Sequence, residues 1–361
     1  MLFIKPMQDA SDKKFELFGI PPDKLAEKFE EIGERKFRAK QIMKWLYAHD
    51  VFDFYQMTDI PVELRAWLSE NASITLPETA EVARSEDGSA KFLFRLSDGK
   101  LVESVYIPDK NRDKHTICVS SQVGCKFGCK FCATGKLGFS RNLSSTEIIG
   151  QIYEVKKYIE QGGNNLTNIV FMGMGEPLDN LDAVVDSIKV LTADVGFGIG
   201  HRKILVSTVG IPEKIEKLMT SGVKPKLAIS LNAPNNRLRS KIMPISKKYP
   251  IESLFPLVQK YYKYSKRWVT FEYVMFAGVN DSLKFADELV RSIKDLPVKV
   301  NLIPFNEVDG IDFKRPDDRI VLRFQSYLLA NSIVATIRQS KGRDISGACG
   351  QLAGKEVLNS R

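Results

Sequence analysis

Short β-rich runs alternate with amphipathic helical stretches over most of the chain, from about residue 116 onward. The strand candidates are rich in β-branched and aromatic residues, and they span residues 116–120, 168–173, 203–208, 226–231, 268–276, 298–303 and 333–338. The stretches between them repeat apolar residues at helical spacing, and they span residues 146–160, 181–191, 213–220, 251–264, 283–294 and 317–330. This alternation predicts βαβ units and a parallel sheet. Six or seven such units are compatible with a doubly wound sheet, a full barrel or an open partial barrel.

The first ninety or so residues follow a different pattern. A charge-rich helical stretch covers residues 22–49 with an interruption near Gly33, and a second short helix is expected at residues 62–71. Residues 91–107 then alternate apolar and polar side chains around Asp98-Gly99, which is typical of a β-hairpin. We therefore expect three parts: a helical accessory domain with a linker at residues 1–90, a strand–helix domain with its preceding hairpin at residues 91–345, and a C-terminal tail at residues 346–361.

The chemically distinctive residues fall just after strand candidates. A loop with three cysteines, residues 125–132, follows the first strand, and a glycine-rich turn at residues 173–177 follows the second. Later strand ends are accompanied in the same way by Ser207, Asn232, Asn306 and Cys349. In parallel α/β folds the active site gathers at the carboxyl ends of the strands. The order of these residues therefore predicts one site at that end of the sheet.

Composition places the chain among globular proteins. It has 361 residues, of which 43% are hydrophobic and 27% are charged. No apolar run approaches the roughly 20 residues that span a bilayer, and the N-terminus lacks the pattern of a secretory signal. We therefore expect a cytoplasmic protein with no membrane partner. The net charge of +9 is compatible with a polyanionic partner, although a merely basic enzyme would have the same charge.

Three of the five cysteines lie in one loop, at Cys125, Cys129 and Cys132, with C-x3-C-x2-C spacing. Thiolates bind iron–sulfur clusters, and a four-iron cluster with three protein ligands keeps one iron open to a small molecule. A structural zinc site usually has four ligands in paired spacings. No fourth ligand lies near this loop, because His115 belongs to the strand that precedes it. The spacing favours one [4Fe–4S] cluster. A zinc-containing RNA-binding module and a non-enzymatic iron–sulfur electron carrier remain as alternatives.

Four motifs in and around this loop resemble those of one enzyme family. They read Cys-Val-Ser-Ser-Gln-Val-Gly-Cys at residues 118–125, Gly-Phe-Ser-Arg-Asn-Leu at 138–143, Phe-Met-Gly-Met-Gly-Glu-Pro at 171–177 and Gly-Ala-Cys-Gly-Gln-Leu at 347–352. The cysteine loop resembles the radical S-adenosylmethionine (AdoMet) signature. The whole set is similar to the bacterial adenine-C2 RNA methyltransferases of the RlmN/Cfr family, and the resemblance extends from about residue 31 to residue 354.

This resemblance implies a partial (βα)6-type radical AdoMet barrel with a small helical N-terminal domain that engages RNA. It implies one [4Fe–4S] cluster and AdoMet as cofactors, and methylation of carbon 2 of an adenosine in the peptidyl-transferase centre of 23S rRNA. A second substrate in the family is often the anticodon loop of tRNA, and the electron donor would be a protein such as flavodoxin or ferredoxin. We expect a monomer. The antibiotic-resistance branch methylates carbon 8 instead, but it typically has Ala where this chain has Pro177.

By the same resemblance, two cysteines outside the cluster loop take part in the reaction. Cys349 matches the residue that carries the methyl group, and Cys118 matches the thiol that resolves the protein–RNA adduct through a transient disulfide. From the residues alone, either could be a small buried side chain. Glu103 matches the base that removes the C2 proton, whereas its place on an alternating hairpin strand is typical of a solvated carboxylate. A functional Glu103 should be partly buried or have a partner.

The resemblance also implies a set of AdoMet contacts. The matching positions are Gly175, Glu176, Ser207, Ser230, Leu231, Asn232 and Asn306. Asn232 departs from the family, which usually has His there, and asparagine can donate and accept hydrogen bonds but cannot become cationic. Two runs combine cations with aromatic residues, as RNA-binding surfaces do, at residues 35–40 and 260–267. A solvated helix face is the alternative interpretation of each run.

Overall fold

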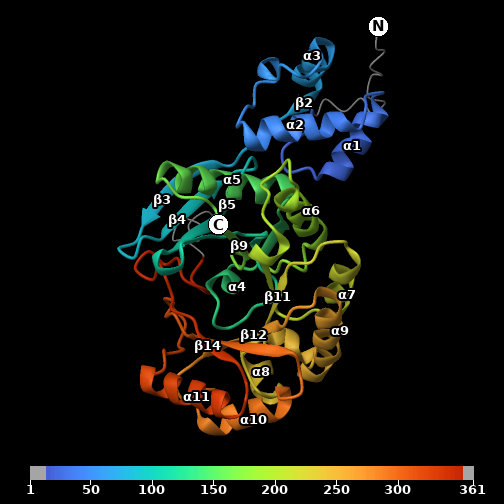
Figure 1. Cartoon of the computed structure of the whole chain (residues 1–361). Helices are drawn as coiled ribbons and strands as arrows, with labels where there is room; N and C mark the ends of the chain where they lie inside the picture. The colour runs from blue at the N-terminus through green and yellow to red at the C-terminus, as the bar shows by residue number, and fades with distance from the viewer. Residues whose placement is uncertain (1–13, 353–361) are drawn as a thin grey trace.

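A ten-stranded mixed sheet forms the centre of the computed structural model, which describes residues 14–352 (Figure 1). Seven of its strands are parallel and lie side by side in chain order. They are β6 (Lys114–Cys118), β9 (Asn168–Phe171), β10 (Ile204–Thr208), β11 (Lys226–Ser230), β12 (Val269–Met275), β13 (Val298–Pro304) and β14 (Ala335–Ile337). The predicted parallel sheet is confirmed.

Six long helices connect these parallel strands. They are α5 (Ser145–Gln161), α6 (Leu181–Thr192), α7 (Pro212–Thr220), α9 (Phe255–Ser265), α10 (Leu283–Ile293) and α11 (Asp318–Ala330). Within residues 14–352 the two outermost strands of the sheet, β14 and β3 (Glu78–Arg84), do not pair with each other, so the sheet stays open. The parallel half is thus a partial barrel with six strand–helix units, as the family resemblance implies.

The two faces of the parallel strands differ in accessibility. On β10, Ile204 and Val206 are buried, whereas Leu205 between them is partly exposed. The buried positions face the helices, where covering each large aliphatic side chain contributes about 1.5–3 kcal/mol. The other face forms the inside of the partial barrel, and Ser207 lies on it with Leu205 because side chains alternate along a strand. Strand alternation therefore divides a helix-covered core from an inner face that carries polar groups.

Three antiparallel strands extend the sheet beyond β6. They are β3, β4 (Ala90–Arg95) and β5 (Leu101–Asp109), and β4 and β5 form the predicted hairpin around Asp98-Gly99. The sheet starts at Glu78, before the expected boundary near residue 90. Residues 78–84 lie at an exposed sheet edge and read Glu-Thr-Ala-Glu-Val-Ala-Arg, so they lack the alternating apolar positions by which a strand is recognised.

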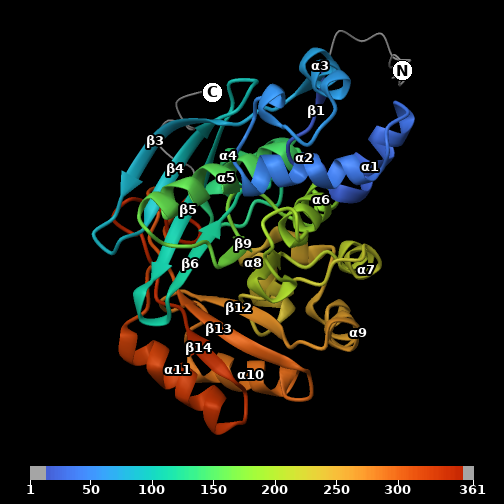
Figure 2. The same cartoon turned by 45° about the horizontal axis from the view of Figure 1, so that its top comes forward.

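The N-terminal helices pack on the outer side of the barrel. They are α1 (Pro22–Glu31), α2 (Phe37–Ala48) and α3 (Val62–Asn71), and the short parallel strands β1 (Phe15–Glu16) and β2 (Ala72–Ser73) join their ends. Figure 2 shows this unit next to α5 and α6. Phe18 contacts Tyr153 of α5 edge-to-face with ring centroids 5.5 Å apart, and Thr146 Oγ1 donates to the Phe18 carbonyl at 2.6 Å. These contacts join the accessory unit to the barrel core.

Several short elements complete the described chain. A two-stranded ribbon, β7 (Gln122–Gly124) and β8 (Phe139–Asn142), flanks the short helix α4 (Ala133–Leu137), and α8 (Asn236–Ile242) follows β11. Single 3-10 turns lie at Phe54–Gln56, Lys110–Arg112, His201–Lys203, Pro244–Lys247 and Ile251–Ser253. The ribbon and α4 matter for function, because they hold the ends of the three-cysteine loop.

Candidate active site

The three-cysteine loop is closed by close backbone approach at its ends. Gly124 has a φ of +75°, and a Cβ there would overlap the carbonyl oxygen of Gly138. The backbone N–H of Cys125 donates to that same carbonyl at 2.8 Å, and the N–H of Cys132 donates to the Cys129 carbonyl at 3.1 Å. Only glycine combines this backbone conformation with this lack of space. The ribbon therefore fixes where the loop begins, and the Cys129–Cys132 turn fixes where it ends.

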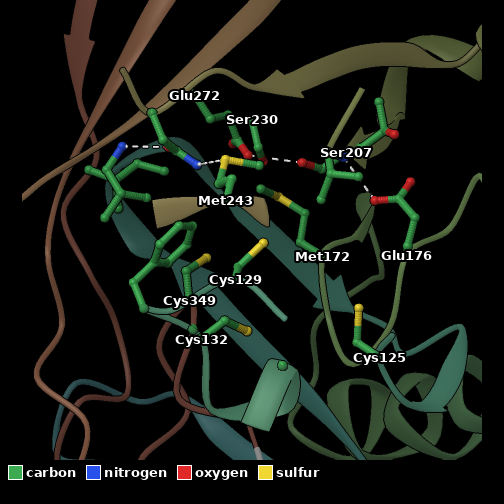
Figure 3. A pocket seen from close by; sticks show the side chains of 18 of the residues that line it. Cys125, Cys129, Cys132, Met172, Glu176, Ser207, Ser230, Met243, Glu272 and Cys349 are labelled. Carbon is green, nitrogen blue, oxygen red and sulfur yellow. Dashed lines mark hydrogen bonds between the residues drawn. The ribbon is translucent and has the colours of Figure 1, made fainter. Parts of the chain in front are cut away.

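All three loop thiols line one cavity on the inside of the partial barrel (Figure 3). In Figure 3, Cys125 lies apart from Cys129 and Cys132, with the cavity between them. Of the predicted AdoMet contacts, six line the same cavity: Gly175, Glu176, Ser207, Ser230, Asn232 and Asn306. Leu231 does not, because it follows the inward-facing Ser230 on β11 and its side chain is buried at 2% exposure. The structure thus brings together residues from the ends of β9, β10, β11 and β13.

The donor set of the loop fits a [4Fe–4S] cluster. Three sulfur ligands face one cavity, and among residues 14–352 no three His, Cys, Asp or Glu side chains converge closely enough to bind a single metal ion. The thiols are therefore spread around the cavity wall, whereas zinc needs its ligands about 2.0–2.3 Å from one point. Burial raises the pKa of each of the three thiols, and the Arg239 guanidinium opposes this shift at Cys129. Cys125, Cys129 and Cys132 can hold a cluster with one iron facing the cavity.

The glycine-rich turn after β9 is held by its own side chains. Gly175 has a φ of +98°, and a Cβ there would lie 2.5 Å from Cβ of Gln122, so glycine is required. Glu176 is buried, and its carboxylate accepts from the backbone N–H of Leu178 at 3.1 Å and of Val209 at 2.8 Å. Burial raises the pKa of Glu176 to about 7, and these hydrogen bonds oppose that shift. Glu176 thus ties the turn to the end of β10, and its predicted contact with the AdoMet ammonium stays a prediction.

Asn232 occupies a left-handed backbone position that asparagine tolerates well, with a φ of +58°. Its side-chain oxygen accepts from the backbone N–H of Val274 at 2.8 Å, and its amide nitrogen lies 3.2 Å from Sδ of Met243. The residue is 1% exposed and lines the cavity. Asn232 therefore fastens the end of β11 to β12. Whether it also contacts AdoMet stays a prediction.

Cys349 reaches the same cavity from the C-terminal tail. Two hydrogen bonds hold the tail. Asn306 Nδ2, after β13, donates to the Cys349 carbonyl at 3.2 Å, and the N–H of Ala133, directly after Cys132, donates to the Gly350 carbonyl at 2.8 Å. The next residue of α4, Thr134, also bonds to the tail through the Leu352 carbonyl. The glycine-flanked loop of Cys349 therefore lies directly against α4 and the segment after β13. The rest of the tail, residues 353–361, lies outside the described residues.

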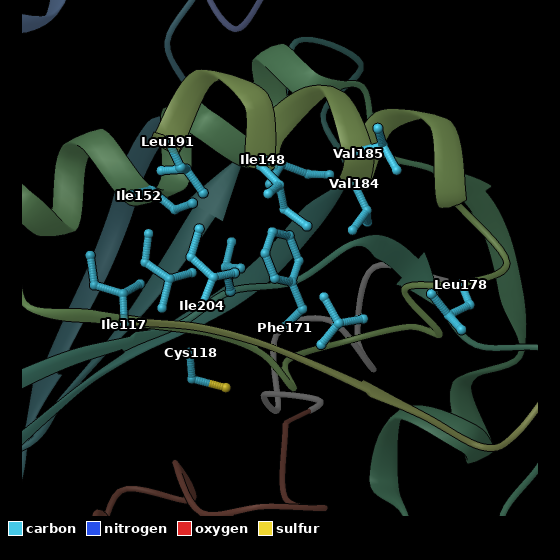
Figure 4. Close-up of a cluster of buried hydrophobic side chains, with 14 of the residues drawn as sticks. Ile117, Cys118, Ile148, Ile152, Phe171, Leu178, Val184, Val185, Leu191 and Ile204 are labelled. Atoms are coloured by element: carbon cyan, nitrogen blue, oxygen red, sulfur yellow. The ribbon is translucent and has the colours of Figure 1, made fainter. Parts of the chain in front are cut away.

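A second, smaller cavity connects Cys349 with Cys118. It is lined by both cysteines, by Met172 and by Arg338, and it shares Cys349 and Met172 with the first cavity. Figure 4 shows Cys118 pointing away from the helix-facing cluster that contains Ile148, Ile152 and Leu191. Burial raises the pKa of the Cys118 thiol to about 12; the nearby Cys349 thiol adds to this shift, whereas the Arg338 guanidinium opposes it. Cys118 is thus an inward-facing thiol beside Cys349.

Glu103 is neither solvated nor exposed. It lies on β5 with 1% of its surface exposed, and its carboxylate forms an ion pair with Nζ of Lys91 on β4 at 3.0 Å. Its strand neighbour on the same face, Val105, pairs with Cys118 across the β5–β6 ladder. Glu103 does not line either cavity. The interpretation as a solvated carboxylate is wrong, and the expectation of burial with a partner is met.

Two charged residues of the site, one buried and one half-buried, do not figure in the sequence prediction. Glu272 on β12 lines the first cavity, is 4% exposed and accepts a hydrogen bond from Ser207 Oγ at 2.9 Å. Arg338 follows β14 and lines the second cavity. Burial raises the pKa of Glu272, and the positive charge of Arg338 opposes that shift. The sequence does contain a signal for each residue. Glu272 is a charged residue inside an apolar strand, and Arg338 is a cation directly after one.

The two cation–aromatic runs lie in different surroundings. Residues 35–40 lead into α2, where the Arg38 guanidinium stacks 4.7 Å from the ring centroid of Phe37 and lies 3.7 Å from Glu34. Residues 260–267 form the end of α9 and the approach to β12. Residues 260–267 therefore lie at the amino ends of the parallel strands, away from the cavity. Among the described residues, no helix combines the length and apolar character needed to cross a membrane.

Comparison with known protein families covers both parts of the chain. The pattern of the ribosomal RNA large subunit methyltransferase N-terminal domain matches residues 15–74, and that of the radical SAM superfamily matches residues 119–289. The first match ends just before β3, in line with the observed start of the sheet. The second contains the cysteine loop and strands β9 to β12.

Individual relatives match nearly the whole chain. The dual-specificity RNA methyltransferase RlmN of Halorhodospira halophila is 47% identical and covers 96% of this chain and 95% of its own length. The protein of the same name from Geotalea uraniireducens is also 47% identical, over 90% of this chain and 92% of its own. The crystal structure of a radical SAM methyltransferase from Sphaerobacter thermophilus has a TM-score of 0.87 and 40% identity, covering 94% of this chain and 99% of that one. The chain belongs to the RlmN family of radical SAM RNA methyltransferases.

Proposed function

We propose that this protein methylates carbon 2 of an adenosine in 23S rRNA and, as a second substrate, in the anticodon loop of tRNA. The observation that carries the proposal is the position of Cys349, which lines both the cavity of the cluster cysteines and the cavity of Cys118. An ordinary iron–sulfur electron carrier has no use for a thiol at this place. A methyl carrier needs such a position, because it must meet a methyl donor on one side and RNA on the other.

The target atom explains why a radical is needed. Carbon 2 of adenine lies between two ring nitrogens and is electron-poor, so it does not attack the electrophilic methyl group of AdoMet. In the proposed site, Cys125, Cys129 and Cys132 hold the cluster, and the surrounding polar residues hold AdoMet. When bound, the cluster and AdoMet supply a 5′-deoxyadenosyl radical that can remove a hydrogen atom from an unreactive methyl group.

Cys349 carries the methyl group through the reaction. Its sulfur first takes a methyl group from one AdoMet, which requires loss of the thiol proton. Burial raises the pKa of the Cys349 thiol, and the Arg338 guanidinium opposes this shift, so Arg338 favours the reactive thiolate. The S-methyl group then loses a hydrogen atom to the radical, and its carbon forms a bond to adenine C2. The product of this step is a covalent protein–RNA adduct with one unpaired electron, which the cluster, when bound, would take back.

Glu103 and Cys118 release the product. Glu103 removes the C2 proton, and Nζ of Lys91 lies 3.0 Å from its carboxylate. The Cys118 thiolate then attacks the sulfur of Cys349 and forms a disulfide. The bond from that sulfur to the transferred carbon breaks, and this carbon takes up a proton to complete the methyl group of the released RNA. The shared cavity of the two thiols supports this pairing. Reduction of the disulfide would prepare the enzyme for the next turnover.

The remaining partners follow from the same proposal. One-electron reduction of the cluster needs a donor such as flavodoxin or ferredoxin, and we expect the protein to act as a monomer in the cytoplasm. Pro177, which lies in the cavity wall next to Glu176, favours carbon 2 over carbon 8 because the carbon-8 branch typically has Ala at this place.

Isomer-resolved mass spectrometry tests the proposed position. RNA methylated by the purified protein would be digested to nucleosides and compared with 2-methyladenosine and 8-methyladenosine standards. We expect 2-methyladenosine from both a 23S rRNA fragment and tRNA. Recovery of only the 8-methyl isomer would assign the chain to the other activity of the family, and product from rRNA alone would remove tRNA from the proposal.

A further inference from the structure

A basic surface groove leads to the pair of reactive cysteines. The groove, of about 570 Å³, lies between α11 and the segment after β14, and four of its lining residues are cationic: Arg315, Arg338, Lys341 and Arg343. Residues 338–341 also line the small cavity that contains Cys118 and Cys349. The groove therefore shares lining residues with the small cavity, and the small cavity shares Met172 and Cys349 with the cluster cavity. Arg338 stands where the groove meets the cysteines.

The positive charge of this groove is only partly neutralised. Asp318 lies 2.9 Å from Arg315 and neutralises that cation. The other acidic residue of the wall, Asp87, accepts from the backbone N–H groups of Ser89 at 2.9 Å and Gly342 at 2.8 Å rather than from a cation. Among residues 14–352, neither Lys341 nor Arg343 forms an ion pair. Two cations of the groove are thus available for an anionic ligand.

The segment that carries these cations is held in place by the turn between β3 and β4. Besides the contact of Asp87 with Gly342, Ser85 Oγ donates to the carboxylate of Asp344 at 2.6 Å. Gly342 has a φ of +65°, a conformation that favours glycine. The turn therefore fixes the backbone on both sides of Arg343. A preorganised pair of cations loses little conformational freedom when a ligand binds.

We propose that this groove binds the RNA strand that carries the target adenosine, and that Lys341 and Arg343 contact its phosphates. The inference rests on the proposed function. An enzyme that modifies a base must take that base out of its stack, at a cost of a few kcal/mol. Phosphate contacts next to the reactive thiols would offset this cost and set the position of the strand. The negatively charged phosphates of an RNA backbone are complementary to the two unpaired cations, Lys341 and Arg343, that border the path to Cys118.

The double variant Lys341→Gln/Arg343→Gln tests this proposal through RNA binding. Affinity for a fluorescent 23S rRNA fragment that contains the target adenosine would be measured over a range of salt concentrations. We expect affinity to fall at least about tenfold, and the slope of log K against log salt to become shallower by about 1.4, since each single-strand phosphate contact contributes about 0.7. The charge-conserving variant Lys341→Arg/Arg343→Lys should keep most of the wild-type slope.

A matched control removes the same charge elsewhere. Lys294 and Lys299 lie near the amino end of β13, and Lys294→Gln/Lys299→Gln should leave the slope unchanged. Iron content and AdoMet affinity report whether each variant keeps an intact site. Wild-type affinity and slope in the Lys341/Arg343 variant would overturn the proposal, as would an equal loss in the control. So would unchanged RNA binding with slower reduction by flavodoxin, which would assign the groove to an acidic protein.

The outcome is separable from that of the proposed function. The binding measurement needs no turnover, so a groove-dependent slope can be found even if the methylated atom is not carbon 2. Conversely, 2-methyladenosine could form in an enzyme whose RNA affinity does not depend on Lys341 and Arg343. The first result would contradict the proposed function alone, and the second would contradict the groove alone.

Discussion

Replacement of Cys349 by alanine is expected to reduce RNA methylation below detection and to leave the iron content of the protein unchanged. Cys349 lines the cluster cavity but is not part of the C-x3-C-x2-C set, so the cluster ligands remain. Without its sulfur, no methyl group can be stored next to the RNA. Radical formation does not need this thiol, so reductive cleavage of AdoMet to 5′-deoxyadenosine should continue in the variant.

The matched variant is Cys349→Ser, which keeps the size of the side chain and the loop around it. A serine hydroxyl is a much weaker nucleophile than a thiolate, so the same loss is expected. Methyl incorporation into RNA and 5′-deoxyadenosine would be measured in the same reaction. Substantial methylation by either variant would contradict the carrier role. Loss of iron together with activity would instead point to a fourth cluster ligand.

Replacement of Cys118 by alanine is expected to stop the reaction one step later. In this variant the methyl carrier can still be loaded and can still add to adenine, but the thiol that shares the small cavity with Cys349 is missing, so the adduct is not released. The protein–RNA adduct should therefore accumulate to about one per enzyme, while released methylated RNA falls below detection. A denaturing gel with labelled RNA would reveal the adduct, and nuclease digestion followed by peptide mass spectrometry would locate it on Cys349.

Two companions sharpen this test. Glu103→Gln should trap the same adduct, because deprotonation at C2 precedes release by Cys118. The nearby Ile117→Val is a control, because Ile117 faces the helix-covered core rather than the cavity and should turn over normally. Normal release of methylated RNA by Cys118→Ala would make Cys118 a small buried side chain without a chemical role. Absence of both product and adduct would place Cys118 before the addition step.

The parallel half of the fold is predictable from sequence because each strand there buries one face against a helix. Burial makes apolar positions recur, and both the strands and the helices between them are therefore found near their observed bounds. β3 is not recognised from the sequence because it is an exposed edge strand without a repeating apolar face. Its place in the sheet depends on pairing with β4. The short helix α8 has too few residues to establish a helical period.

The site is predictable to the extent that its residues belong to a local motif. The cysteine loop is such a motif, and Cys349 stands out by its flanking glycines. Leu231 is predicted to contact AdoMet only because it lies in a segment that matches the family. Side chains alternate along a strand, so Leu231 points away from Ser230 and toward the core. Glu272 lies on β12 and Arg338 follows β14, and these two strands are separated in the sheet by β13. No spacing along the chain indicates that both residues belong to the site.

Surface function is the least predictable property. The cation–aromatic run at residues 260–267 has a composition typical of RNA-binding segments, but composition does not say at which end of a barrel a segment lies. The structure places it at the amino ends of the strands, whereas Lys341 and Arg343, two isolated cations in a glycine-containing loop, border the groove that reaches the cysteines.

The central claim is that Cys349 hands its own methyl group to RNA, and isotope transfer tests it most directly. The protein would first be methylated with AdoMet that carries a CD3 group, freed of excess donor, and then given RNA, reductant and unlabelled AdoMet. Because one deuterium is lost to the radical and replaced by hydrogen, the first equivalent of product should carry a CHD2 group on adenosine. An unlabelled CH3 group, or an intact CD3 group, in that first equivalent would contradict the account.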